Sequence, residues 1–260
     1  MDHETTLSFE MQIGRQKPST IRNKQTSCPF CNTSDLENII DREGDIILLE
    51  NKFPTLKNTF QTVLIETNQC NGEFSDYPRE HLHKLMRFAF RKWEDYEQSG
   101  NYKSVLLFKN HGPYSGGTIS HPHMQIVGLK HVDYKENISN KNFEGTAIFK
   151  TEDVEFNIST NPIMGFYEFN VSIQDIKHVE KMADCLQNGV HYLKNHFRSK
   201  IESYNLFFYK INGSYKGKIV PRYVASPYFV GYKIPQVSND IEVIANQVTE
   251  IYFRGETSSI

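Results

Sequence analysis

The 260-residue sequence has no long hydrophobic run and no excess of charge of either sign. No stretch approaches the about 18 uninterrupted apolar residues of a membrane-spanning helix, so we expect no membrane segment. The first four residues supply neither a basic nor an apolar segment, so we expect no secretory signal and a cytoplasmic protein. Basic and acidic residues number 29 and 31, which argues against a nucleic-acid surface but leaves room for a local phosphate site.

Cysteine is scarce, with four residues in all. In a cytosolic chain of this size so few cysteines argue against a disulfide framework. Two of them form the motif Cys28-Pro-Phe-Cys31. Two cysteines separated by two residues are either a redox couple or half of a zinc site. A redox pair usually follows a strand and opens a helix, whereas this motif lies in a polar, loop-like stretch. The setting favours a metal, and two inert cysteines are the alternative.

Aromatic residues make up 13% of the chain, which indicates a globular rather than a disordered protein. Residues 1–27 show little apolar periodicity and are predicted to be an extended arm or loops. The first half is then predicted to contain four strands and one helix, namely strands at 45–50, 62–66, 104–109 and 124–129 and a helix at 78–98. Pro78 suits the first turn of this helix, and Ser75 or Asp76 is the predicted cap.

The second half repeats this order, with strands at 165–173 and 204–211 on either side of a helix at 174–198. The loop beginning at Lys109 is similar to the segment beginning at Lys210, with an offset of 101 at Lys, Gly and Tyr. We therefore predict a duplication, with residues 1–130 as one half and 131–260 as the other. The alternative is two unrelated halves that share loop residues. The predicted fold class is α+β, with mainly antiparallel sheets and one long helix in each repeat.

The densest chemical signal is the segment from Gly112 to Gln125, which joins a glycine-rich loop to His121-Pro-His123. Two residues apart on an extended chain, the two histidines point the same way. Glycines let the backbone approach a ligand closely, and free N–H groups there are suited to hold a phosphate. At the offset of 101, the second half carries Arg222 and Val224 in place of the histidines, so we expect one such site per chain.

Four motifs together resemble the galactose-1-phosphate uridylyltransferase family of the histidine-triad (HIT-like) superfamily. They are Cys28-Pro-Phe-Cys31, Asn51-Lys-Phe-Pro54, Phe108-Lys-Asn110 and His121-Pro-His123-Met-Gln125. Their order and approximate spacing agree with the family across residues 15–130. That family is built from two HIT-like repeats, so the resemblance implies the same architecture here.

The resemblance implies that His123 is a nucleophile that attacks the α-phosphorus of a nucleoside diphosphate compound and forms a covalent nucleotidyl-histidine. Imidazole is largely unprotonated at neutral pH, as such an attack requires. The backbone carbonyl of His121 would accept a hydrogen bond from the second ring nitrogen of His123 and so fix its tautomer. Gln125 would donate a hydrogen bond to a phosphate oxygen. Because the glutamine amide neither accepts nor releases a proton at neutral pH, it favours nucleotide transfer over hydrolysis.

The resemblance also implies one structural zinc ion held by Cys28, Cys31 and His121. Zinc-containing members of the family usually place a histidine at the fourth ligand position, which matches Cys70 here. Thiolate and imidazole are both good zinc donors, so we predict that Cys70 completes the site; a free loop thiol is the alternative.

The remaining family positions predict the substrate site. Asn51 and Phe53 would contact the base, Asn110 and Thr118 the phosphates, and Arg15 or Lys17 would balance the phosphate charge. The last two expected substrate contacts are Gly116, in the glycine-rich loop, and Tyr232, in the Phe229-Val-Gly-Tyr232 segment that is similar to a late segment of the family.

The expected activity is nucleotidyl transfer, first of all uridylyl transfer between a UDP-sugar and a hexose 1-phosphate. An ADP-sugar or dinucleoside polyphosphate phosphorylase or adenylyltransferase is the alternative, because Asn51 and Phe53 do not distinguish uracil from adenine. Pro227 and Lys233 depart from the family's sugar-binding positions and weaken the case for galactose. A zinc-stabilised nucleotide-binding protein without turnover is a third alternative. The expected partners are a nucleotide-sugar and a sugar phosphate or phosphate, without nucleic acid or membrane, and a homodimer is left open.

Two further expectations concern residues outside these motifs. His81, His83, His191 and His196 lie off the apolar helix faces and are predicted to be solvated. His111 lies inside the glycine-rich segment and is a candidate ligand contact, whereas Cys185 is predicted to be a small buried residue.

Overall fold

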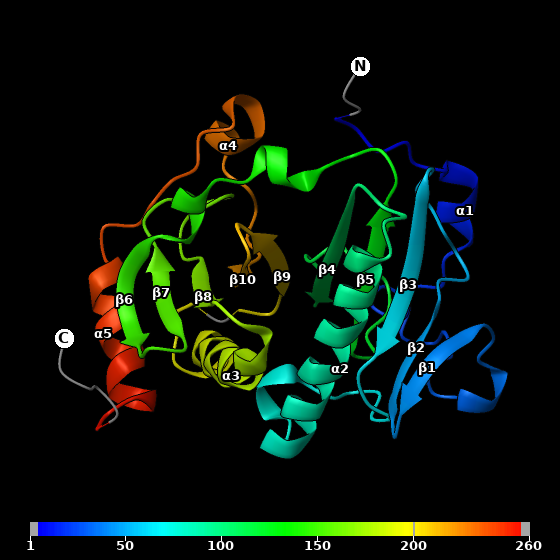
Figure 1. The fold of residues 1–260 in the computed structure, drawn as a ribbon, viewed down its shortest axis with the longest axis horizontal. Helices are drawn as coiled ribbons and strands as arrows, with labels where there is room; N and C mark the ends of the chain where they lie inside the picture. The colour runs from blue at the N-terminus through cyan, green and yellow to red at the C-terminus, as the bar shows by residue number, and fades with distance from the viewer. Residues whose placement is uncertain (1–4, 200, 256–260) are drawn as a thin grey trace.

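One sheet of ten strands runs through the molecule, and every strand pairing in the described residues is antiparallel (Figure 1). The computed structural model describes residues 5–199 and 201–255. The strands are β1 (Ile39–Glu43), β2 (Ile46–Glu50), β3 (Thr59–Ile65), β4 (Ser104–His111), β5 (His123–Leu129), β6 (Gly145–Lys150), β7 (Glu155–Ser159), β8 (Phe169–Ile173), β9 (Tyr204–Ile211) and β10 (Ser214–Pro221). The α+β class and the antiparallel arrangement are therefore confirmed.

The strand order is the same in the two halves of the sheet. It runs β1-β2-β3-β5-β4 and then continues as β9-β10-β8-β7-β6, so that β4 pairs with β9 at the centre. In each half one long helix connects the third strand to the next one in the chain: α2 (Arg79–Gln98) follows β3, and α3 (Val179–Asn195) follows β8. Both helices pack on the same face of the sheet and against each other (Figure 1). This recurring order is what a duplication would produce.

The predicted apolar faces of the two long helices are buried against the sheet. In α2, Leu82, Leu85, Met86 and Trp93 are fully buried, and Phe88 and Phe90 add to the same core. In α3, Cys185 is buried as predicted. The cap prediction for α2 is wrong: Pro78 occupies the cap position without a side-chain hydrogen bond, because Ser75 and Asp76 belong to a preceding 3-10 turn.

Several elements escaped the sequence patterns. They are the strands β1, β6, β7 and β10 and the helices α1 (Met11–Gln16), α4 (Pro227–Tyr232) and α5 (Ile241–Tyr252). Strand β1 lies at the sheet edge and is mostly exposed, so it lacks a buried apolar alternation. The predicted strand at 165–173 begins only at Phe169, and the helix predicted from 174 begins as a 3-10 turn at Ile176.

The offset of 101 does not hold beyond the two central strands. Where the first half has the loop 112–122, the second half has a two-residue turn, Asn212-Gly213, with φ of 51° and 79°. Positive φ at both positions is typical of a tight hairpin turn, which needs no long loop. Strand β10 therefore begins at Ser214, and its Tyr215 pairs with Ile173 as His123 pairs with Ile65. Val224 lies beyond β10 and is 93% exposed, so it is not the counterpart of His123.

Most of the helix histidines are half-buried and hydrogen-bonded rather than free in solvent. His81 donates from Nε2 to the carbonyl of Glu66 at 2.9 Å, and His83 contacts Asp184 at 2.6 Å across the α2–α3 interface. His191 contacts the hydroxyl of Tyr252, whereas His196 is exposed as predicted.

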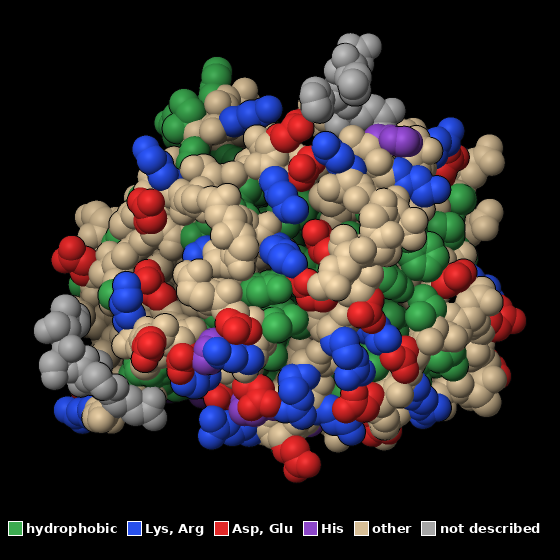
Figure 2. All heavy atoms as spheres, in the orientation of Figure 1, with side chains coloured by type: hydrophobic (Ala, Val, Ile, Leu, Met, Phe, Trp, Pro, Cys, Tyr) green, Lys and Arg blue, Asp and Glu red, His purple; other side chains and the backbone are tan. Residues whose placement is uncertain are grey.

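Hydrophobic side chains are exposed over α4 and the segments beside it, where they form a visible patch in Figure 2. They include Val224, Tyr228, Val230, Tyr232 and Ile234, each more than half exposed. No helix within residues 5–199 and 201–255 is both long and apolar enough to cross a membrane. The expectation of no secretory signal concerns residues 1–4, which lie outside the described residues.

Candidate active site

Strand β5 presents its side chains alternately to the two faces of the sheet. Met124 and Ile126 are buried in the core beneath the helices. His123 and Gln125 line a cavity on the opposite face. The period of two along a strand therefore places the expected nucleophile and the expected phosphate contact next to each other on one surface.

His123 is held in a single ring orientation. Its Nδ1–H donates to the backbone carbonyl of His121 at 2.8 Å, which leaves Nε2 without a proton. The side chain is 6% exposed and lines the cavity. Burial lowers the pKa of His123 to about 4, so the ring is neutral at pH 7. A neutral imidazole with a free nitrogen lone pair is a competent nucleophile.

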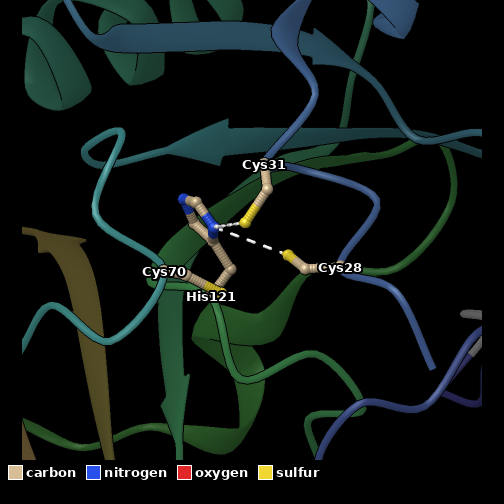
Figure 3. A group of neighbouring side chains, drawn as sticks. All are labelled: Cys28, Cys31, Cys70 and His121. Atoms are coloured by element: carbon tan, nitrogen blue, oxygen red, sulfur yellow. Dashed lines mark hydrogen bonds between the residues drawn. The ribbon is translucent and has the colours of Figure 1, made fainter. Parts of the chain in front are cut away.

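Three cysteines and one histidine from three separate segments converge beside this strand (Figure 3). Cys28 and Cys31 come from the N-terminal loop, Cys70 from the loop after β3, and His121 from the segment before β5. Their ligand atoms all lie within 4.8 Å of one another. The Nδ1 atom of His121 lies 3.5 Å from Sγ of Cys28 and 3.6 Å from Sγ of Cys31.

The four side chains fit a metal ion. Sulfur atoms about 2.3 Å from a tetrahedral zinc ion lie about 3.8 Å apart, which is within the observed spread. Nε2–H of His121 donates to the carbonyl of Thr67 at 2.8 Å, so the Nδ1 lone pair faces the sulfur atoms. Burial, with the neighbouring thiols, raises the pKa of Cys70 to about 12, and a bound cation is what would make the thiolate form. The group can hold one metal ion.

His121 connects the candidate metal group to the expected nucleophile, His123. Its ring is one of the four side chains of that group, and its carbonyl accepts the hydrogen bond from His123. Phe30, between the two cysteines of the motif, packs edge-on against both histidine rings, with centroid distances of 5.9 and 5.4 Å. Phe30 was not among the expected site residues, although its place inside the Cys-x-x-Cys motif was the available signal.

The cavity has a volume of about 530 Å³ and brings together most of the expected substrate residues. Those that line it are Asn51, Phe53, Asn110, Gly116, Thr118, His123 and Gln125. Arg15 does not line it; it is exposed on α1, whereas Lys17 is half-buried and lines the cavity. Tyr232 is 75% exposed on α4 and is not among the lining residues either.

Two of the cavity residues are fixed by local contacts. Oδ1 of Asn51 accepts the backbone N–H of Phe53 at 2.9 Å, so its NH₂ group remains available to a ligand. Lys17 donates to the hydroxyl of Thr55 at 3.3 Å, and burial lowers the pKa of this lysine. Lys17 is therefore better placed than Arg15 to balance a phosphate charge.

The loop 112–122 needs glycine at its start. Gly112 has φ of +82°, and a Cβ there would lie 2.1 Å from the carbonyl oxygen of Glu202 in the second half. Gly116 also has a positive φ, +90°, but faces open space. On the other side, Thr20 accepts the backbone N–H of Ser120 at 2.8 Å. The N-terminal arm and the second half thus hold the loop between them.

A buried ion pair lies beneath the two histidines. Nζ of Lys109 is 2.5 Å from Oε1 of Glu66, and the two side chains are 1% and 0% exposed. Tyr77 donates to the other carboxylate oxygen at 2.9 Å, and the backbone N–H of Glu66 donates to the carbonyl of Pro122 at 3.1 Å. The pair therefore joins the end of β3, strand β4 and the turn before α2 to the peptide between the histidines. No sequence pattern indicated this ion pair.

His111 is committed to a different cluster. Its Nε2 lies 3.0 Å from Glu73, and its ring stacks on Tyr204 with a centroid distance of 4.8 Å. Glu73 also accepts from Tyr204 at 2.6 Å and pairs with Lys194 of α3. His111 lines a second cavity rather than the one that contains His123. It therefore joins the halves and does not face the candidate nucleophile.

Two family models cover most of the chain. They match residues 9–132 and 135–253 and are described as the N-terminal and C-terminal domains of a domain of unknown function, DUF4931. A crystal structure of a DUF4931 family protein from Bacillus cereus is 48% identical and covers 83% of this chain and 99% of that one, with a TM-score of 0.76. The chain belongs to the DUF4931 family.

This DUF4931 protein is also similar to a curated galactose-1-phosphate uridylyltransferase from Thermotoga maritima. The two are 25% identical in an alignment 128 residues long, which covers 42% of this chain and 39% of that protein. An ADP-glucose phosphorylase from Arabidopsis thaliana with bound ADP-glucose shares the fold, with a TM-score of 0.72 and 15% identity, and covers 90% of this chain and 94% of that one. These findings confirm the resemblance to the galactose-1-phosphate uridylyltransferase family, although the chain spans under half of the curated relative's length.

Proposed function

We propose that this DUF4931 protein is a nucleotidyltransferase that works through a covalent nucleotidyl-histidine at His123. The observation that carries the proposal is the buried, neutral imidazole whose Nδ1–H is bound by a carbonyl while its ring lines a cavity. Asn110, Thr118 and Gln125 line the same cavity and supply polar groups suited to phosphate oxygens.

The reaction takes two displacements. Nε2 of His123 attacks the α-phosphorus of a nucleoside diphosphate compound, a P–N bond forms, and the bond from the α-phosphorus to the bridging oxygen breaks to release the first phosphate product. An oxygen of the acceptor phosphate then attacks the same phosphorus and breaks the P–N bond, which regenerates the imidazole. Nδ1 keeps its proton throughout, and the carbonyl of His121 stabilises the positive charge of the intermediate ring.

Gln125 favours a phosphate acceptor over water. Its amide can donate to a phosphate oxygen, but it cannot accept or deliver a proton at neutral pH. An attacking water has to lose a proton, whereas an ionised phosphate does not. Transfer to a phosphate therefore needs no base at this position.

Uridylyl transfer between a UDP-sugar and a hexose 1-phosphate is the leading reaction, supported by the similarity to a uridylyltransferase over 128 residues. An ADP-sugar or dinucleoside polyphosphate phosphorylase or adenylyltransferase is the alternative, since Asn51 and Phe53 suit either base. A nucleotide-binding protein without turnover is the third. We also propose that residues 1–130 form a catalytic HIT-like half, that residues 131–260 form a degenerate one, and that the metal is a single structural zinc ion held by Cys28, Cys31, Cys70 and His121.

Intact-mass spectrometry tests the covalent step and names the base. The purified protein is incubated separately with UDP-glucose, ADP-glucose and diadenosine tetraphosphate, and a gain of one UMP or one AMP is expected with at least one of them. His123→Ala should show no gain while still binding the nucleotide within about tenfold, because the alanine removes only the attacking nitrogen. Gln125→Ala should form the adduct more slowly by about 10²–10³, which is the usual cost of one lost donor to a developing charge.

An adduct of unchanged yield in His123→Ala would overturn the assignment of the nucleophile. Nucleotide binding by the wild type with no adduct from any of the three compounds would favour the alternative of a protein without turnover.

A further inference from the structure

The side chain of Asn205, on the central strand β9 of the second half, contacts the glycine-rich loop 112–122 of the first half. Asn205 and Asn110 are directly opposite each other where β9 pairs with β4. Nδ2 of Asn205 donates to Oδ1 of Asn110 at 2.6 Å, to the carbonyl of Ser115 at 3.0 Å and, more weakly, to the carbonyl of Lys109 at 3.4 Å. Asn205 is 1% exposed.

The orientation of this amide follows from its partners. Carbonyl oxygens only accept hydrogen bonds, so the group facing Ser115 and Lys109 has to be the NH₂ of Asn205. On the other side, Nη1 of Arg222 donates to Oδ1 of Asn205 at 2.8 Å, and a guanidinium only donates. Arg222 follows β10 and is itself anchored by its backbone N–H, which donates to the carbonyl of Ser203 at 2.8 Å.

The orientation of Asn205 determines that of Asn110. Because an NH₂ group faces it at 2.6 Å, Asn110 has to turn its oxygen toward Asn205. Its own NH₂ group is then left for the cavity that Asn110 lines, and within the described residues no hydrogen bond occupies it. An amide that presents only its NH₂ group recognises an anion, whereas one that turned its oxygen to the cavity would repel a phosphate.

We propose that Asn205, held by Arg222, is a positioning residue of the second half that makes Asn110 a hydrogen-bond donor toward the substrate phosphate. This inference rests on the proposed function, since it assumes that a phosphate occupies the cavity beside His123. It assigns a task to a half of the chain that carries no His-x-His motif. Asn205 does not touch the reacting atoms; it acts through Asn110.

Asn205→Asp is the sharpest test, because a carboxylate accepts only and would favour the opposite orientation of Asn110. The chain offers a matched control in Asn170→Asp. Asn170 is 0% exposed and donates to its cross-strand partner Asn157 at 2.8 Å, on β8 and β7 rather than beside the cavity. Both variants are compared with the wild type by thermal unfolding, so that a general loss of stability is seen separately.

The measured quantity is the ratio of the affinity for a nucleoside monophosphate to the affinity for the same nucleoside, which reports the contribution of the phosphate. Calorimetry gives the affinities for UMP and uridine, and for AMP and adenosine. Asn205→Asp should lower the preference for the monophosphate at least tenfold while nucleoside affinity stays within threefold, and it should slow adduct formation by about 10². Asn170→Asp should leave both quantities within threefold of the wild type. A merely structural role for Asn205 would lower nucleoside and monophosphate binding alike, and that result would overturn the proposal.

A double-mutant cycle tests the route through Asn110. Asn205→Ala should weaken monophosphate binding in the wild type but change it less than threefold in the Asn110→Ala background. An equal loss in both backgrounds would show that Asn205 acts independently and would overturn the inference. If the wild type prefers monophosphates but forms no adduct, the covalent mechanism fails while this inference stands. If the adduct forms and Asn205→Asp is unchanged, the inference fails alone.

Discussion

Replacing Glu66 by glutamine should destabilise the protein strongly, because it leaves the ammonium group of Lys109 buried without a counter-charge. Lys109 is 1% exposed and its Nζ lies 2.5 Å from the Glu66 carboxylate. Glutamine keeps the size of the side chain and can still accept from Tyr77. The substitution therefore removes one charge and very little packing.

The expected cost follows from the burial of both groups. Removing one partner of a fully buried ion pair typically costs about 3–5 kcal/mol, since the remaining charge has lost its hydration and gained nothing in return. For a chain of this size, 1 kcal/mol lowers the melting temperature by about 2–4 °C. Glu66→Gln should therefore lower it by about 6–20 °C.

Differential scanning calorimetry measures this shift, and the chain supplies two comparisons. Glu155→Gln removes the carboxylate from an ion pair of 2.9 Å with Lys150, whose side chain is 67% exposed, and should cost less than about 1 kcal/mol. The double variant Glu66→Gln, Lys109→Met removes both buried charges and should recover most of the loss. A melting temperature for Glu66→Gln within 2 °C of the wild type would refute the reasoning, as would a double variant less stable than the single one.

Three further predictions concern the site and its supports. Elemental analysis should give about one zinc ion per wild-type chain and less in Cys70→Ser. The melting temperature of this variant should also fall, since metal binding contributes to the folding free energy. Full metal content at full stability would exclude Cys70 as a ligand. Gly112→Ala should lower the free energy of unfolding in urea by about 2–4 kcal/mol, because alanine is strained at φ of +82° and its Cβ would lie 2.1 Å from the Glu202 carbonyl oxygen. Gly213→Ala, with open space around the Cβ, should lower it only by the backbone strain of about 1–2 kcal/mol. Burial acts to raise the pKa of Glu73, but the hydrogen bonds and charges of His111 and Lys194 outweigh it and hold the pKa of that carboxyl below its ordinary value. Glu73 therefore contributes stability that is complete above about pH 5 and is lost as the pH falls, so Glu73→Gln should flatten the decline of the melting temperature below pH 5, and an unchanged pH profile would contradict this.

The elements that the sequence predicted best are those with a strong period and a buried face. Helix α2 carries an apolar face with a 3.6-residue period from Leu82 to Tyr96, and β5 begins at His123, the second histidine of the His-x-His motif. The metal group was within reach of the sequence because cysteine and histidine are rare and their spacing carries meaning. The sequence did not predict the edge strand β1, because its residues are exposed or half-buried and show no alternation of buried apolar and exposed polar side chains.

The hairpin between β9 and β10 was signalled by Asn212-Gly213, a dipeptide typical of tight turns. The segment around Gly213 is similar in sequence to the segment around Gly112, and this similarity suggested a long loop instead of a turn. Because of that comparison, Val224 was wrongly expected to be the counterpart of His123. The contact between Asn205 and Asn110 had no signal of its own. It depends on β4 and β9 lying side by side, which only the assembled sheet determines.

The central pairing of β4 with β9 also has a consequence for synthesis on the ribosome. The other neighbour of β4, strand β5, is complete at Leu129, but residues 130–203 have to be translated before β9 begins. At about 5–20 residues per second this takes roughly 4–15 s, during which a first half that has already folded exposes a bare strand edge. Such an edge is a template for pairing with other chains. A nascent first half therefore has to be shielded or left partly unfolded until β9 emerges, and slow translation of residues 130–203 is the condition under which aggregation is most to be expected.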